Sequence, residues 1–189
     1  MSLLALDSRW RRFNDESRTC PCCGQSFNGI FDIGFDHPDT WPHEALRDSG
    51  ETELQVGEDR LSADLCRVDE HRFIRCVLPL PLRGSDEHFC FGAWASVKPE
   101  NFYRYIDDAV GEAEEFEGCF AWLMNDLPGY ESEDPIACDL VPGDEGQRPT
   151  LKVHAGPLAD AQKEGITFDQ LLDIYAASGN DIRPHLAAD

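Results

Sequence analysis

Three cysteines lie within four residues near the start of the chain, in the segment Cys20-Pro21-Cys22-Cys23-Gly24. Cys20 and Cys23 have the Cys-x-x-Cys spacing with which a tight turn supplies two thiolates to a tetrahedral zinc ion. Gly24 permits the backbone to fold back, so that N–H groups approach the sulfurs. The segment therefore predicts half of a structural zinc site, with Cys22 as a non-ligand. The tighter Cys-x-Cys pair formed by Cys20 and Cys22 is the alternative.

No second Cys-x-x-Cys pair follows in the sequence, so the fold must bring the other ligands in from elsewhere. We expect Cys66 as the third ligand, because it lies in an expected strand with Asp64 close by. His154 is the tentative fourth ligand, and His71 and Cys138 are weaker candidates. Unliganded thiols and a dithiol redox sensor remain alternatives for the cluster. A redox dithiol is typical of a helix start in a βαβ unit, and the chain shows no such context.

Other signatures of catalysis are missing from the sequence. It contains neither a phosphate-binding glycine loop ending in Lys-Ser/Thr nor a Gly-x-Gly-x-x-Gly motif. The zinc-protease helix motif and the Gly-x-Ser-x-Gly elbow are absent as well. An enzyme would need an unrecognised pocket, and the region of Cys66, Arg75 and Trp94 is the candidate place for it.

The charge of the chain restricts its partners. Asp and Glu number 37 and Lys and Arg 16, which gives a net charge of −21. Nucleic acids and anionic membranes require a basic footprint, so both are disfavoured. The richest basic stretch, from Arg9 to Arg18, is short and interspersed with acidic residues. The acidity favours solubility and, as a more specific interpretation, a basic protein partner.

Cysteine usage and hydropathy indicate the compartment. No run approaches the ~18 apolar residues of a membrane helix, and the first twelve residues lack the apolar core of a signal peptide. The eight cysteines are therefore expected as thiols or metal ligands in a cytoplasmic protein. The sequence does not predict the oligomeric state.

The apolar patterning predicts an α+β fold. Its sheet is expected to be an antiparallel meander, because the connections in the centre are too short for parallel crossovers. Two or three helices are expected to pack on this sheet, with the Cys knuckle at the N-terminal end. The expected strands span 63–68, 72–80, 88–97, 118–124, 135–141 and 149–154. The expected helices begin at Pro99 and span 167–177, with a helical turn at 157–163.

We predict a single domain over residues 1–189. Residues 1–19 form an N-terminal arm, and residues 20–60 contain the Cys knuckle and irregular loops. Residues 61–177 form the α+β core, and residues 178–189 a frayed tail.

Several short motifs appear in a fixed order along the chain. They are Asp64-Leu65-Cys66, Arg72-Phe73-Ile74-Arg75, Leu80-Pro81-Leu82, Phe91-Gly92-Ala93-Trp94-Ala95-Ser96-Val97, Phe102-Tyr103-Arg104-Tyr105, Leu127-Pro128-Gly129-Tyr130 and Pro157-Leu158-Ala159, with Gln162 and Gly165-Ile166. With them the chain, from about Cys20 to about Ile174, resembles the bacterial family called domain of unknown function 2199.

The resemblance implies a shared fold and no established activity. It also implies cysteines at the positions of Cys20, Cys23 and Cys66, which supports them as ligands. Family members often read His-Pro-Leu where this chain has Gly156-Pro157-Leu158. A ligand at that place would here have to come from His154.

From these observations we expect a non-enzymatic protein-interaction module with a structural zinc site. One version is an immunity-like protein that masks a basic toxin. The enzyme with an unrecognised pocket and the thiol redox sensor are the alternatives.

Overall fold

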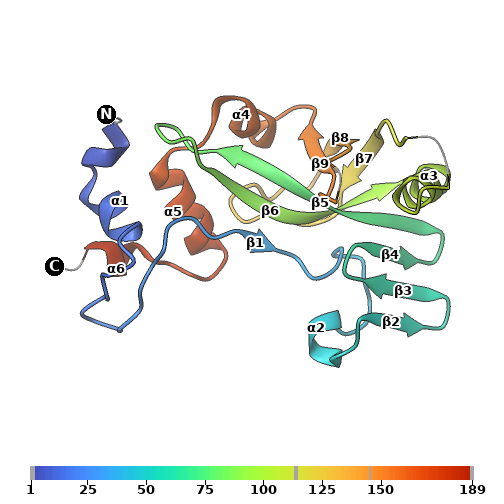
Figure 1. The fold of residues 1–189 in the computed structure, drawn as a ribbon, viewed down its shortest axis with the longest axis horizontal. Coiled ribbons are helices and arrows are strands. Elements are labelled where there is room, and N and C mark those ends of the chain that lie inside the picture. Colours follow the sequence, from blue (N-terminus) through green and yellow to red (C-terminus); the bar gives the residue numbers. More distant parts are fainter. Residues whose placement is uncertain (1–2, 113–114, 145, 188–189) are drawn as a thin grey trace.

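The computed structural model describes residues 3–112, 115–144 and 146–187. The ends of the expected domain, residues 1–2 and 188–189, lie outside the described residues. Figure 1 shows the elements. The helices are η1 (Leu3–Leu6), α1 (Ser8–Phe13), α2 (Leu46–Ser49), α3 (Pro99–Ala109), α4 (Pro157–Glu164), α5 (Phe168–Ala177) and α6 (Arg183–Ala187). The strands are β1 (Ile33–Gly34), β2 (Glu53–Val56), β3 (Asp59–Ser62), β4 (Leu65–Val68), β5 (His71–Pro81), β6 (His88–Val97), β7 (Cys119–Leu123), β8 (Ala137–Val141) and β9 (Thr150–Val153).

The mixed α+β character of the chain agrees with the sequence, but the sheet is not a simple meander. Strands β5 to β9 pair in sequence order, and β9 returns to β5 in parallel, which closes a five-stranded barrel. The expected antiparallel meander exists as β4, β5 and β6. The parallel closure was not predicted, because it joins strands that are far apart in the sequence.

Two prolines shape the seam of this barrel. The N–H of Val77 donates to the carbonyl of Pro149 at 2.9 Å, but Pro79 and Pro81, next along the same edge, have no N–H to donate. The side-chain amide of Gln162 in α4 takes the place of the missing strand neighbour on β9. It accepts from the N–H of Val153 at 2.8 Å and donates to the carbonyl of Leu151 at 2.9 Å.

Two apolar clusters lie on opposite faces of β5 and β6. Ile74 and Ala95 belong to the larger cluster, which fills the barrel and continues under α4 and α5. Phe73 and Trp94, one residue away in each strand, belong to the smaller one. This follows from the alternation of side chains along a strand.

The smaller cluster is covered by a segment that the sequence predicts to be irregular. Part of residues 20–60 forms α2, β2 and most of the hairpin with β3, and Trp41 and Leu54 pack there against Trp94. The interruption of this segment by Gly and Pro hid its short strands.

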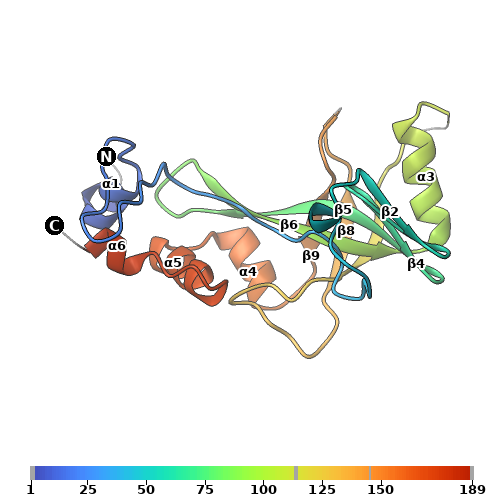
Figure 2. The ribbon, with the colours of Figure 1, turned by 90° about the horizontal axis from the view of Figure 1, so that it is seen from below.

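The C-terminal segment is also ordered, contrary to the expected frayed tail. Residues 183–187 form α6, and Ile182 and Leu186 are fully buried. Figures 1 and 2 show α6 beside α1 and α5 at one end of the molecule, with β2–β4 and α3 at the other. Of the described helices, α3 and α4 contact β5 and α2 contacts β2, whereas α1 and α6 contact each other. Among the described residues, no helix combines the length and apolar character needed to cross a membrane.

A buried tyrosine fastens α5 to the segment that follows the cysteines. The hydroxyl of Tyr175 donates to the carbonyl of Phe31 at 2.9 Å and accepts from its N–H at 3.1 Å. The two rings are stacked with centroids 4.0 Å apart.

We predict that Tyr175→Phe lowers the free energy of unfolding by about 1–3 kcal/mol, because both backbone groups of Phe31 then lose their partner. Urea denaturation measures the change. Tyr103→Phe, at an exposed tyrosine of α3, serves as the control and should change stability by less than about 0.5 kcal/mol. Equal effects of the two substitutions would contradict the role of the Tyr175 hydroxyl.

Candidate metal centre

The three neighbouring cysteines lie in a tight backbone turn. The N–H of Cys20 donates to the carbonyl of Gln25 at 2.7 Å, and the N–H of Gly24 donates to the carbonyl of Cys20 at 2.9 Å. Thr19 and Ser26 form an isolated antiparallel bridge at its base. Gly24 has a φ of 77°, a left-handed conformation that favours glycine. Hydrogen bonds and a bridge among residues 19–26 thus shape the turn.

His185 of α6 completes a cluster of four potential ligands. Its Nδ1 lies 3.2 Å from the sulfur of Cys23 and 3.5 Å from the sulfurs of Cys20 and Cys22. The Cys20 and Cys22 sulfurs are 2.9 Å apart, and all four ligand atoms lie within 4.8 Å of one another. Within the described parts of the chain, this is the one group of His, Cys, Asp and Glu side chains close enough to hold a metal ion.

The spacing can be compared with that of a tetrahedral zinc site. With Zn–S at ~2.3 Å and Zn–N at ~2.05 Å, tetrahedral angles place sulfur and nitrogen about 3.5 Å apart and two sulfurs about 3.8 Å apart. The three sulfur–nitrogen distances are close to this value. The Cys20–Cys22 distance of 2.9 Å is shorter than this. To bind an ion, these two sulfurs would have to move apart by a further distance of about 1 Å or less.

Arginines of the N-terminal arm hold α6 in place beneath the cysteines. Arg12 donates to the carbonyl of Leu186 at 2.8 Å, and Arg18 donates to the carbonyl of His185 at 3.1 Å. Such donors satisfy carbonyls that the end of a helix leaves without partners. Phe27 packs against the imidazole of His185, with ring centroids 6.2 Å apart. The basic stretch of the sequence thus organises the fold around the site.

A hydrogen bond between the thiols of Cys20 and Cys22 shifts their pKa values in opposite directions. The bond from the Cys22 thiol is the main cause that lowers the pKa of Cys20 to about 6, with smaller contributions from backbone N–H groups and His185. The same contact raises the pKa of Cys22 to about 11. Of these two thiols, Cys20 is therefore the first to become a thiolate, which is the form that binds metals and reacts with oxidants.

A protein-family comparison gives the context of this site. The family model described as "Uncharacterized protein conserved in bacteria (DUF2199)" matches residues 19–166. The chain belongs to this family. No curated protein and no solved structure matches it. Because the DUF2199 family is described as uncharacterized, membership assigns no activity. The matched residues include the three clustered cysteines, whereas His185 lies beyond them.

In this DUF2199 chain, Cys66 does not join the other cysteines. It lies in β4, at the opposite end of the molecule from α6 (Figures 1 and 2), within the smaller apolar cluster. Burial raises the pKa of its thiol to about 12, so it stays protonated. The third cysteine of the cluster is instead Cys22, which the sequence predicts as a non-ligand. The Cys-x-x-Cys spacing of Cys20 and Cys23 leaves Cys22 out, but the structure brings all three sulfurs near His185.

His154 also lies elsewhere, and His185 stands in its place. His154 follows β9 and pairs with Asp139 at 3.0 Å. His185 was missed because its segment was expected to be frayed. A signal was available, since Ile182 and Leu186 have the i, i+4 spacing of one helical stripe. Of the predicted ligands, the structure brings together Cys20 and Cys23.

The structure does bring Cys66, Arg75 and Trp94 into one neighbourhood. Cys66 and Trp94 pack in the same apolar cluster, and the Arg75 guanidinium lies 5.8 Å from the centroid of the Trp94 ring. Cys66 and Trp94 are almost completely buried. A thiol that is buried and protonated is a poor nucleophile, so this arrangement supports packing better than catalysis.

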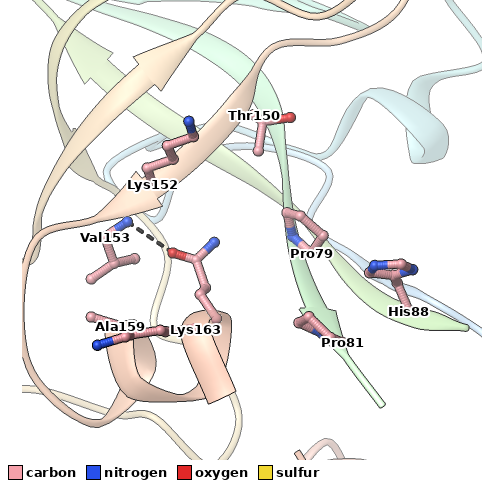
Figure 3. A pocket seen from close by; sticks show the side chains of 9 residues that line it. Pro79, Pro81, His88, Thr150, Lys152, Val153, Ala159 and Lys163 are labelled. Atoms are coloured by element: carbon pink, nitrogen blue, oxygen red, sulfur yellow. Dashed lines mark hydrogen bonds between the residues drawn. The ribbon is translucent and has the colours of Figure 1, made fainter. Parts of the chain in front are cut away.

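A hollow of about 380 Å³ lies at the barrel seam beside Pro79 and Pro81. Lys152, Lys163 and His88 are among its lining residues. Figure 3 shows these three side chains spread around the rim and pointing in different directions. Because these side chains do not converge on a common point, the hollow does not form an anion-binding site. The three thiols and His185, by contrast, do converge.

The unequal pKa values give a testable pH dependence. In metal-free protein, we predict that thiolate absorbance in the ultraviolet first rises with a midpoint at about pH 6, from Cys20. Cys22→Ala removes the donated hydrogen bond, so the midpoint should move up towards the ordinary thiol range. A midpoint unchanged in Cys22→Ala would contradict this assignment of the cause.

Proposed function

We propose that the protein binds one zinc ion through Cys20, Cys22, Cys23 and His185, and that the ion has a structural role. The observation that carries the proposal is the approach of a histidine from α6 to within 3.5 Å of three thiols at the other end of the chain. An ion at this place would fasten the N-terminal turn to the C-terminal helix.

The ligand types favour zinc and a closed site. Thiolates and imidazole together suit zinc, and four protein ligands leave no coordination position for a substrate or a water. The same cluster without metal would be the redox sensor considered above. The presence of the imidazole next to all three sulfurs favours a metal site, because exchange between thiols and a disulfide needs only sulfurs.

We predict about one zinc per chain in protein purified without chelator, as measured by plasma mass spectrometry. His185→Asn and Cys23→Ser should each lose most of this metal. Each should also lower the free energy of unfolding by about 3 kcal/mol, the amount expected when a ligand at a hundred times its Kd no longer binds.

Two control variants distinguish this ligand set from the one predicted by sequence. Cys66→Ala and His154→Asn remove the same chemical groups at the other two positions, and both should retain the zinc. Retention of zinc in His185→Asn, or its loss in His154→Asn, would contradict the proposed set. The metal content decides this independently of the stability change.

We further propose that this zinc-stabilised domain acts as a non-enzymatic binding module for a basic protein. The support is its net charge of −21, which favours encounters with a cationic partner and repels nucleic acid and anionic lipid. An immunity-like protein that masks a basic toxin is one form of such a module.

The expected signature of the module is charge-dependent binding. A labelled 12-residue peptide that alternates Arg and Ala should bind the protein at physiological ionic strength, as followed by fluorescence anisotropy. The same peptide with citrulline in place of arginine should not bind, because it has the shape without the charge. Binding should disappear near 1 M salt, where the Debye length is about 3 Å. Equal binding of both peptides would argue against the proposal.

A further inference from the structure

Two aromatic side chains stand exposed next to each other on β7. Phe120 and Trp122 are 46% and 41% exposed, and their rings meet edge to face with centroids 5.0 Å apart. They alternate with the buried Ala121, so both lie on the outer face of the barrel. Exposed tryptophan and phenylalanine in contact are unusual on a highly charged surface, which marks this place as a candidate interaction site.

A pocket of about 500 Å³ lies next to this aromatic pair. Glu131, Asp134 and Tyr130 are among the residues that line it. Of the described residues that line it, none is Lys or Arg. Glu131 accepts a hydrogen bond from the N–H of Gly129 at 3.0 Å, and this bond lowers its pKa, so the carboxylate stays ionised.

The pocket and the aromatic pair form one continuous surface. His154 lines the pocket, and its ring centroid lies 5.8 Å from that of Phe120. Ala137, which also lines the pocket, is the register partner of Trp122 across β7 and β8. Asp139, the register partner of Phe120, adds a third carboxylate beside the rings.

We propose that this surface, formed by Phe120, Trp122 and the pocket with Glu131 and Asp134, binds an arginine-rich segment of a partner protein. Guanidinium groups stack on the faces of Trp and Phe and pair with carboxylates in a fork geometry, so the arginines of such a segment match both halves of the surface. The inference rests on the proposed function as a module for a basic partner.

Charge complementarity favours this occupant over a second copy of the chain. Two copies of net charge −21 would bring their carboxylates together around the same rings. An arginine-rich segment instead neutralises the carboxylates while its apolar stems cover the rings.

The test uses zinc-loaded protein of residues 1–189 and the alternating Arg–Ala peptide. Trp122→Thr keeps a residue that suits a strand and removes the ring, and we expect it to weaken binding at least roughly fivefold. Trp122→Phe should restore most of the affinity. Tyr103→Ala removes an aromatic ring of similar exposure, 47%, on α3 and should leave the affinity unchanged.

A second pair of variants separates the local carboxylates from the net charge. Glu131→Gln with Asp134→Asn removes two charges inside the pocket, whereas Glu51→Gln with Glu70→Gln removes two exposed charges elsewhere. The first pair should weaken binding several-fold more than the second. Circular dichroism and thermal melting verify that each variant is folded.

The outcomes distinguish the inference from the function on which it rests. If the wild type binds the arginine peptide and Trp122→Thr binds it equally well, this surface is wrong and the acidic module stands. Equal losses in the two carboxylate pairs would likewise overturn the surface. If the wild type does not prefer arginine to citrulline, the proposed function fails, and the surface fails with it.

Discussion

The antiparallel ladder between β5 and β6 joins ten residue pairs, from Arg72 with Val97 to Pro81 with His88. Each of the two strands has an apolar cluster on either face, so the ladder is buried on both sides for part of its length. Its backbone hydrogen bonds are therefore shielded from water where the clusters cover it. Any change that shifted the register by one residue would exchange the contents of the two clusters, Phe73 for Ile74 and Trp94 for Ala95.

The barrel depends on this ladder, and its seam shows how a closed sheet accommodates an imperfect edge. Prolines at alternate positions end the parallel pairing of β5 with β9 after a single register pair, Val77 with Thr150. The amide of Gln162 then satisfies the groups that β9 exposes at the gap. A side chain with one donor and one acceptor in fixed geometry reproduces the pattern of a peptide group. These backbone groups of β9 therefore have hydrogen-bond partners although no strand lies beside them.

The parts of this structure that sequence predicts are those specified by nearby residues. The strands around β5 and β6 follow from alternation, and α5 follows from its apolar stripe and the Thr167 capping box. The closure of the barrel and the approach of His185 to the cysteines depend on contacts between distant segments, and no local pattern encodes them. Cys66 is a further example. The sequence predicts its strand correctly, but not the residues of the smaller apolar cluster that surround it.

The candidate site joins residues separated by 162 to 165 positions, yet three of its four ligands are neighbours in the sequence. An ion can therefore bind the unfolded chain through the cysteines alone, since their turn is local. Metal that binds both states stabilises the fold only by the difference between its two affinities. That difference would reside in His185, because the folded chain already holds it beside the cysteines, whereas the unfolded chain would first have to close a loop of most of its length. In the proposed site, His185 would therefore contribute both to the affinity of the folded chain for the ion and to the stability that the ion adds.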